Sequence, residues 1–233
     1  YLVKTFYKKA DAIIAPTKVI KNDLIRNYNI KKNNITVINN PYDFKEIYLK
    51  SKEIIKVKEK KFFKNPFILS VGRLNSQKNY ELLIRIFYHI IKDKKFKNYK
   101  LYILGDGREK EKLNKLINDC GLKNKAYLLG FKENPYKFMK KCKLFILSSK
   151  YEGHSNVLVH SQILNNKILA SYAYGANKEV LQNYGDIFSS KNPNDIAIQA
   201  RNILKKKKKI NSEKYLYNRF NDQNVALKFS KLF

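Results

Sequence analysis

The sequence predicts an α/β fold in which a doubly wound parallel sheet is covered by helices on both faces. Two observations lead to this prediction. Apolar runs of strand length alternate with amphipathic helical patterns through most of the 233 residues. The predicted strands are also almost continuously apolar, as in sheets that are buried on both sides. A hydrophobic fraction of 44% is that of a folded globular chain.

Before residue 66 the alternation is irregular. The apolar run at 11–16 predicts a strand, and Thr17 can cap a helix that follows to about residue 28. A second strand is expected at Ile35–Ile38, and it ends at the turn sequence Asn39-Asn40-Pro41. Residues 42–65 are charged and lack clear periodicity, which predicts a connector with some helix.

From Pro66 onward, strands and helices follow one another regularly, and the helical pattern after the first of these strands has one apolar face. The predicted strands are Phe67–Val71, Lys100–Leu104, Ala126–Leu129, Leu144–Leu147, Ile168–Ser171 and Asp186–Phe188. The predicted helices are Tyr80–Ile91, Arg108–Cys120, Pro135–Lys141, Ser155–Leu164, Lys178–Gln182, Pro193–Lys207 and Ser212–Leu232.

The formal net charge of +30 has three explanations: nucleic-acid binding, an anionic membrane surface, or a compositional bias toward lysine. Lysine supplies nearly all of the charge and is spread over every segment, whereas arginine, the usual reader of base edges, is scarce. We therefore expect no specific nucleic-acid partner. Of the other two explanations of the charge, we favour a compositional bias toward lysine over attraction to anionic lipid.

The two cysteines, Cys120 and Cys142, fit neither a metal-ligand spacing nor a disulfide framework, which favours small core hydrophobes in a reducing cytoplasm. No apolar run approaches the roughly 20 residues of a membrane-spanning helix. The start does not resemble a signal peptide, and its first residue is Tyr1 rather than Met, so we expect a piece of a longer chain.

Ligands bind beyond the carboxyl ends of the strands in a doubly wound sheet, so the loops that follow the strands carry the candidate site. The first loop, Gly72 to Asn79, places Arg73 and Lys78 where two cations could cradle a diphosphate. The second contains Gly105-Asp106-Gly107, a tight turn. A third, 148–155, leads into a helix start, whose free N–H groups bind phosphate readily. Glu152 just before it could accept hydrogen bonds from sugar hydroxyls.

Together and in this order, these motifs resemble the carboxyl-terminal domain of a family 4 glycosyltransferase, and residues 10–41 are similar to the segment that ends that family's first domain. The resemblance implies a GT-B architecture of two Rossmann-like domains. It also implies retaining transfer from a nucleotide-diphosphate sugar, favouring a UDP-sugar, without cofactor or metal ion. The domains expected are 1–45, the end of the acceptor-side domain; 46–65, a linker; 66–210, the donor-binding domain; and 211–233, a helix crossing back.

The resemblance also assigns roles. Arg73 and Lys78 would hold the donor diphosphate and stabilise the leaving group, and Glu152 would contact the donor sugar. The remaining donor-binding positions lie in the loops and at the helix start, the base being held near the two residues that follow Gly130. These positions are Gly72, Gly105, Phe131, Lys132, Gly153, His154, Ser155, Asn156, Val157 and His160.

Two positions qualify the resemblance. The family has a second glutamate, separated from the first by seven residues, that holds the ribose hydroxyls, and this chain has His160 there. Histidine lacks the two-oxygen acceptor that grips a vicinal diol. Glu179 matches a further acidic position of the family, and we interpret it as an acid at a helix start.

We therefore expect a glycosyltransferase acting on a glycan or lipid-linked acceptor in surface-glycan assembly, located in the cytoplasm and peripheral at the membrane. The alternative suggested by His160 is a degenerate, non-catalytic nucleotide-binding subunit. A nucleic-acid binder, suggested by charge alone, is a third hypothesis, and it predicts steeply salt-dependent binding.

Overall fold

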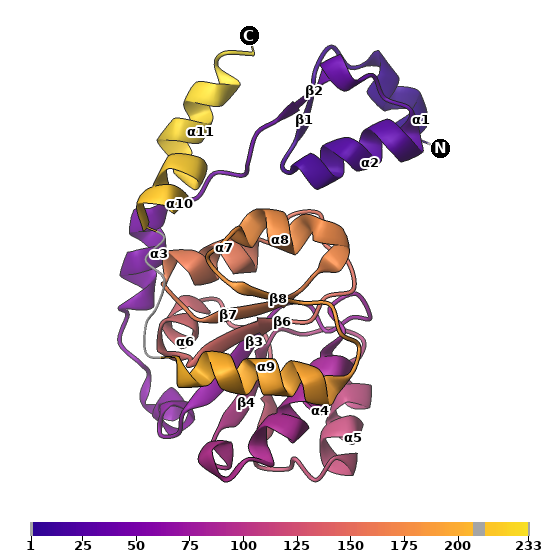
Figure 1. Ribbon diagram of the computed structural model, residues 1–233. Coiled ribbons are helices and arrows are strands. Elements are labelled where there is room, and N and C mark those ends of the chain that lie inside the picture. Colours follow the sequence, from indigo (N-terminus) through magenta and orange to yellow (C-terminus); the bar gives the residue numbers. More distant parts are fainter. Residues whose placement is uncertain (1, 207–212, 233) are drawn as a thin grey trace.

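The computed structural model describes residues 2–206 and 213–232 (Figure 1). Its larger unit is a six-stranded sheet with the strand order β5-β4-β3-β6-β7-β8. Every neighbouring pair in this sheet runs parallel. The strands are β3 (Phe67–Val71), β4 (Lys100–Leu104), β5 (Ala126–Leu128), β6 (Leu144–Leu147), β7 (Ile168–Ser171) and β8 (Asp186–Phe188).

Two apolar cores sandwich this sheet because successive residues of each strand face opposite sides. Ile68 of β3 packs into the core under α4, α5 and α9. Its neighbour Leu69 packs into the core under α6, α7 and α8, to which α3 (Phe44–Ser51) and α10 (Glu213–Phe220) also contribute. Helices therefore cover both faces, and the predicted α/β class is confirmed. The helices of the unit are α4 (Tyr80–Ile91), α5 (Lys110–Asp119), α6 (Tyr136–Lys141), α7 (Asn156–Ile163), α8 (Ala176–Leu181) and α9 (Pro193–Lys205), with the 3-10 turns η4 (Lys94–Phe96) and η5 (Ala173–Gly175).

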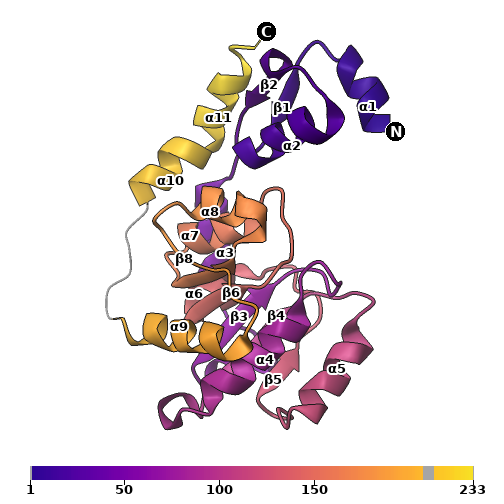
Figure 2. The ribbon, with the colours of Figure 1, turned by 45° about the vertical axis from the view of Figure 1, so that its right-hand side comes forward.

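A smaller unit lies above the carboxyl edge of the sheet (Figures 1 and 2). Its strands β1 (Ile13–Ala15) and β2 (Ile35–Val37) pair in parallel. Thr17 caps helix α2 (Lys18–Tyr28), as predicted, and Ile13, Leu24 and Ile35 are among the residues of the apolar core of this unit. The 3-10 turn η2 (Lys32–Asn34) precedes β2. Helix α1 (Leu2–Phe6) and the 3-10 turn η1 (Tyr7–Lys9) come first and were not predicted.

The segment between the two units contains helix α3 (Phe44–Ser51) and a longer 3-10 turn, η3 (Val57–Phe63). Asp43 caps α3 by accepting a hydrogen bond from the Glu46 amide. The apolar face of α3 packs against α6 and α7 of the larger unit. The expected connector with some helix is therefore present, and it is built into the second core of the sheet.

The final segment is not the single helix predicted for Ser212–Leu232. It forms α10 (Glu213–Phe220) and α11 (Asp222–Phe229), while Ser212 lies outside the described residues. Asn221 interrupts the helix with an extended backbone (φ −60°, ψ 139°), and its side chain caps α11. An asparagine that can cap a new helix competes with continuation of the preceding one. The helical pattern of the sequence therefore predicted one helix where there are two.

Three further predictions can be checked against the fold. Helix α9 ends at Lys205, and Lys207 of the predicted range lies outside the described residues. Neither cysteine is in a disulfide, and both pack against the apolar cores, Cys142 buried and Cys120 partly buried. Within residues 2–206 and 213–232, none of the helices has the length and apolarity needed to cross a membrane.

Candidate functional site

The candidate site lies where the loops after β3, β4, β5 and β6 meet at the carboxyl edge of the sheet. Glycines let these loops touch. A Cβ at Gly105 would lie 2.0 Å from the Gly72 carbonyl oxygen, and one at Gly107 would lie 2.5 Å from the Leu74 carbonyl oxygen. The Gly105 N–H also donates to the Gly130 carbonyl at 2.9 Å. The two glycines of Gly105-Asp106-Gly107 therefore allow the backbones of three loops to pack in direct contact.

Lys78 and Glu152 form the charged centre of the site. The Lys78 Nζ lies 2.6 Å from the Glu152 Oε1, and the two side chains are only 15% and 7% exposed. An ammonium group has three N–H donors, and the described residues give this one a single partner. The two residues, 74 positions apart in the chain, are thus held together at the edge where a ligand is expected.

The loop that carries Glu152 is tied to the loop that carries Lys78. The Ser148 hydroxyl lies within hydrogen-bonding distance of the Lys78 and Asn79 carbonyl oxygens, at 2.9 and 3.0 Å. The Lys150 amide donates to the Gln77 carbonyl at 2.8 Å, and the Gln77 side chain donates to the Tyr151 carbonyl at 3.0 Å. The two loops therefore form one unit, which fixes the geometry of the ion pair.

Arg73 lies on the exposed part of the first loop, one residue before the fully buried Leu74. Within residues 2–206 and 213–232 it takes part in none of the ion pairs, whereas Lys78 is already paired. The predicted pair of cations is thus asymmetric, with one ammonium held by a carboxylate and one guanidinium facing solvent.

Helix α7 begins in the same loop, after Gly153 and His154. Its N-cap residue Ser155 has an extended backbone, but its side chain does not cap the helix. The Ser155 hydroxyl is buried and has no hydrogen-bond partner among the described residues. A helix start that lacks a capping side chain leaves first-turn N–H groups for other acceptors. Asn156 and Val157 follow directly in that first turn.

Phe131 and Lys132 lie further along the edge, against the connector. Phe131 is 77% exposed, and both residues line a cavity of about 340 Å³ beside η3. The Lys132 ammonium is 3.9 Å from the Glu59 carboxylate, which Lys137 contacts at 2.8 Å. Burial raises the pKa of Glu59, but the hydrogen bond from Lys137 and the neighbouring lysine charges outweigh burial and bring the pKa below its ordinary value.

His160 sits among aromatic rings. Its ring centroid is 5.3 Å from that of Tyr42 and 5.2 Å from that of Tyr136, both edge-on. The Tyr42 hydroxyl donates to the Asn156 Oδ1 at 2.7 Å, and the His154 Nδ1 lies 3.3 Å from the same oxygen. Tyr42 is thus a residue of the site that the sequence analysis missed, and the turn sequence just before it is the only signal that pointed there.

Comparisons with known proteins identify the family. A model described as glycosyl transferases group 1 matches residues 51–219, and one described as glycosyltransferase family 4 matches residues 1–46. The chain belongs to the group 1 glycosyltransferases. It is 41% identical over 161 residues to the N-acetylgalactosamine-N,N'-diacetylbacillosaminyl-diphospho-undecaprenol 4-alpha-N-acetylgalactosaminyltransferase of Campylobacter jejuni, a match covering 69% of this chain and 41% of that protein.

Solved structures show the same fold as this group 1 glycosyltransferase chain. Anabaena HepE in complex with UDP superposes with a TM-score of 0.80 at 18% identity, covering 96% of this chain and 63% of that one. A TarM variant from S. aureus, in complex with Fondaparinux, alpha-GlcNAc-glycerol and UDP, gives 0.80 at 19% identity, covering 100% and 45%. These likenesses confirm the expected GT-B type of fold. The chain spans between two fifths and two thirds of the length of these three proteins.

In this glycosyltransferase chain the smaller unit docks directly on the candidate site. The Thr17 hydroxyl donates to the Gly153 carbonyl at 3.0 Å and accepts from the Ile20 amide. Glu179 accepts two further hydrogen bonds, from the Lys18 and Val19 amides at 2.7 and 3.0 Å. Glu179 lies in the first turn of its own helix, as we interpreted it, and its carboxylate also caps the start of α2. We call these contacts of Thr17 and Glu179 the α2 clasp.

The histidine environment predicts an acid-sensitive fold. Burial, and then the charge of His154, lower the pKa of His160 from 6.5 to about 4. The unfolded chain binds this proton below about pH 6.5, while the folded chain excludes it down to about pH 4. Stability should therefore fall as the pH drops through this window, by up to about 3 kcal/mol.

Urea unfolding across this pH window measures the effect, with His160→Phe as the matched variant because it keeps an aromatic ring between Tyr42 and Tyr136. The difference in unfolding free energy between the two proteins should be constant above pH 7. On acidification the wild type should lose more stability than the variant, which has no imidazole at this position. Parallel pH profiles would show that His160 titrates normally.

Proposed function

We propose that this chain is the donor-binding part of a retaining glycosyltransferase that moves a sugar from a nucleotide diphosphate to a glycan or lipid-linked acceptor. The proposal rests on one observation: the buried Lys78–Glu152 pair lies in loops joined to each other just before the start of α7. Cation, carboxylate and helix start supply the three groups that a nucleotide-diphosphate sugar requires.

Each group has a defined task. Lys78 and Arg73 hold the diphosphate and take up the negative charge that develops on the leaving group, which is the part that a metal ion takes in other transferases. The N–H groups at the start of α7, around Gly153–Val157, add partial positive charge. Glu152 accepts hydrogen bonds from sugar hydroxyls while it orients the Lys78 ammonium.

A uridine nucleotide is the donor we favour, since the HepE and TarM structures both contain UDP. The base would lie near Phe131 and Lys132, beyond Gly105 and Gly130. The acceptor would face this edge from the smaller unit. The relative from Campylobacter jejuni acts, by its name, on a diphospho-undecaprenol-linked sugar, which supports a lipid-linked acceptor and a place at the inner face of the cell membrane. The high net positive charge suits such a surface.

We retain the domain division proposed from the sequence, with residues 1–45 on the acceptor side, 46–65 as linker, 66–210 binding the donor and 211–233 crossing back. Contacts of the last segment support the crossing. The Tyr42 amide donates to the Phe220 carbonyl at 2.9 Å, and the Arg219 Nε donates to the Asn39 Oδ1 at 3.2 Å.

Calorimetric titration with UDP, GDP and ADP tests the proposal. A variant at His160 tests whether this position contacts the ribose of the nucleotide. We expect UDP to bind in the micromolar range. His160→Glu should raise the UDP affinity by about tenfold, because a carboxylate accepts from both ribose hydroxyls. The gain should vanish with 2′-deoxyuridine diphosphate.

Equal affinity of the His160→Glu variant for both nucleotides would place the ribose away from residue 160. Absence of binding by all three nucleotides would remove the proposal itself. Released UDP in the presence of a UDP-sugar then distinguishes a working transferase from a degenerate binding subunit.

A further inference from the structure

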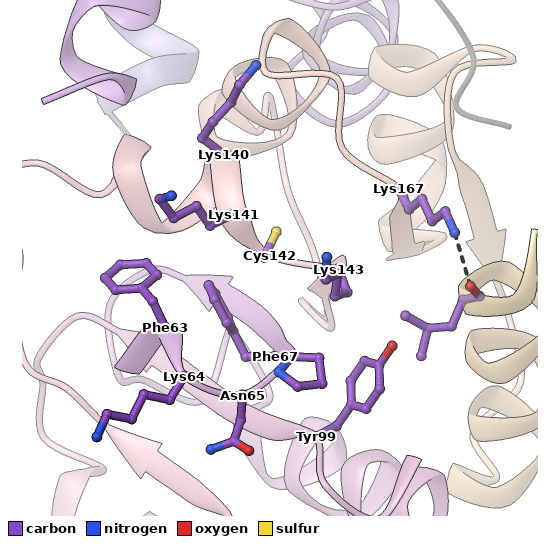
Figure 3. Close-up of a pocket in the computed structure, with 12 residues that line it drawn as sticks. Phe63, Lys64, Asn65, Phe67, Tyr99, Lys140, Lys141, Cys142, Lys143 and Lys167 are labelled. Atoms are coloured by element: carbon purple, nitrogen blue, oxygen red, sulfur yellow. Dashed lines mark hydrogen bonds between the residues drawn. The ribbon is translucent and has the colours of Figure 1, made fainter. Parts of the chain in front are cut away.

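A second concave surface lies at the opposite edge of the sheet, where β3, β6 and β7 begin (Figure 3). It is a hollow of about 570 Å³, and its twelve lining residues come from the end of η3, the η4–β4 turn, the ends of α6 and α9, and the starts of these strands. A five-residue strand separates this edge from the candidate donor site, a distance of about 16 Å. We call it the lysine pocket.

Every charged residue that lines the lysine pocket is a lysine. Five of its twelve lining residues are lysines and none is a carboxylate: Lys64, Lys140, Lys141, Lys143 and Lys167. The lysine-rich composition alone does not explain this. The cavity beside Phe131 also has five lysines in its lining, but it has three glutamates as well: Glu53, Glu59 and Glu133.

Lys167 aside, the lysines of the pocket lack ion-pair partners within the described residues. Lys64, Lys140, Lys141 and Lys143 are exposed and take part in none of the ion pairs found there. Lys167 has a different task, because its ammonium donates to the Leu204 carbonyl at 3.0 Å and thereby joins β7 to the end of α9. Like charges gathered around one hollow repel one another, and a bound anion relieves that repulsion.

Figure 3 shows how the side chains surround the hollow. Lys64 lies on the side of Phe63 and Asn65, while Lys141 and Lys143 lie on the opposite side. The Lys140 side chain starts from that opposite side and points away from the hollow, toward the Tyr48 ring. Tyr99 points its hydroxyl toward the space between Lys143 and Lys167. Lysine ammonium groups sit on flexible stems with three donors each, so those at the rim can turn toward a ligand inside. A tyrosine hydroxyl adds a neutral donor.

We propose that the lysine pocket binds a ligand that carries more than one phosphate group. Several separated ammonium groups match several separated phosphate charges better than they match a single carboxylate. The phosphates belong either to a soluble polyphosphate or to a phospholipid headgroup. The site is independent of the donor-binding edge, so a nucleotide diphosphate at that edge leaves it open.

The test uses the whole chain and two triple variants with equal charge change. Lys64→Gln/Lys141→Gln/Lys143→Gln removes three charges from the pocket. Lys8→Gln/Lys31→Gln/Lys32→Gln removes three exposed charges from the smaller unit. Thermal melting confirms that both variants are folded. Inorganic tripolyphosphate is titrated by calorimetry, with and without saturating UDP, and vesicles of phosphatidylcholine with or without cardiolipin are tested by co-sedimentation.

We expect the pocket variant to lose at least about tenfold in tripolyphosphate affinity because three ammonium–phosphate contacts are removed. The control variant and the UDP-saturated protein should bind as wild type. Loss of cardiolipin binding in the pocket variant alone assigns the phosphates to a lipid, and retention assigns them to a soluble ligand. Equal losses in both variants, or displacement of tripolyphosphate by UDP, overturn the proposal.

Discussion

Replacing Lys78 by methionine is expected to lower the affinity for UDP by about tenfold to a hundredfold, because a hydrogen bond to a charged group contributes about 1.5–3 kcal/mol. Methionine keeps most of the length of the side chain and removes the ammonium that lies 2.6 Å from Glu152. Arg73→Ala should cause a loss of similar size without affecting the fold, since Arg73 is exposed. Calorimetric titration measures both losses.

The controls separate phosphate binding from a structural effect. Lys78→Met leaves the Glu152 carboxylate 7% exposed and without its partner, which destabilises the protein. The double variant Lys78→Met/Glu152→Gln should recover the melting temperature but not the affinity. Arg26→Ala, an exposed arginine of α2, should bind UDP normally. Wild-type affinity in both Lys78→Met and Arg73→Ala would show that the diphosphate lies elsewhere.

Removing the contacts of the α2 clasp is expected to lower the stability of the protein and to weaken the docking of the smaller unit. Thr17→Val keeps the shape of a fully buried side chain but removes its hydroxyl, which contacts both Gly153 and Ile20. Glu179→Ala removes the acceptor of two backbone amides. Each change should cost about 1–2 kcal/mol in unfolding free energy, as the loss of a helix cap does. Urea unfolding measures the cost.

Hydrogen exchange locates the effect of the clasp. In both variants the amides of Lys18, Val19 and Ile20 should exchange faster, and Thr17→Val should also expose the loop at 153–157. Asn192→Ala removes a cap of the same type from α9, where Asn192 accepts from the Asn194 amide. It should leave α2 protected. A clasp variant that affects only global stability, with unchanged relative exchange at α2, contradicts the docking role.

The sequence predicted every strand of the six-stranded sheet, because runs such as Leu144–Leu147 are apolar at each position and are bounded by charged or turn residues. Helices were harder to bound where local capping intervened, as at Asn221. Helix α1 was missed because lysine is mixed into its apolar residues. Local patterns specify elements, whereas tertiary hydrogen bonds decide where they end.

Site residues in the loops after the strands could also be predicted from the sequence, whereas tertiary contacts of the site could not. Lys78 and Glu152 could be selected because each lies in a loop that follows a predicted strand, and parallel strands bring their carboxyl ends together. Their hydrogen bond could not be foreseen. Thr17 reaches the site only through the docking of the smaller unit, Glu179 of α8 meets α2 through the same docking, and Tyr42 reaches the site from the connector. No periodicity encodes these contacts, so the sequence analysis assigned no role in the site to Tyr42 and only roles at helix starts to Thr17 and Glu179.

Amide chemical shifts of the isotope-labelled chain, recorded during titration with UDP, test the central claim most directly. If the diphosphate rests between Lys78 and the start of α7, the amides of Gly72 and of residues 153–157 should shift with a common saturation curve. Amides of the lysine pocket, such as that of Lys143, should remain unchanged at the same nucleotide concentration. Shifts confined to that pocket, or saturation without any change at residues 153–157, would contradict the account.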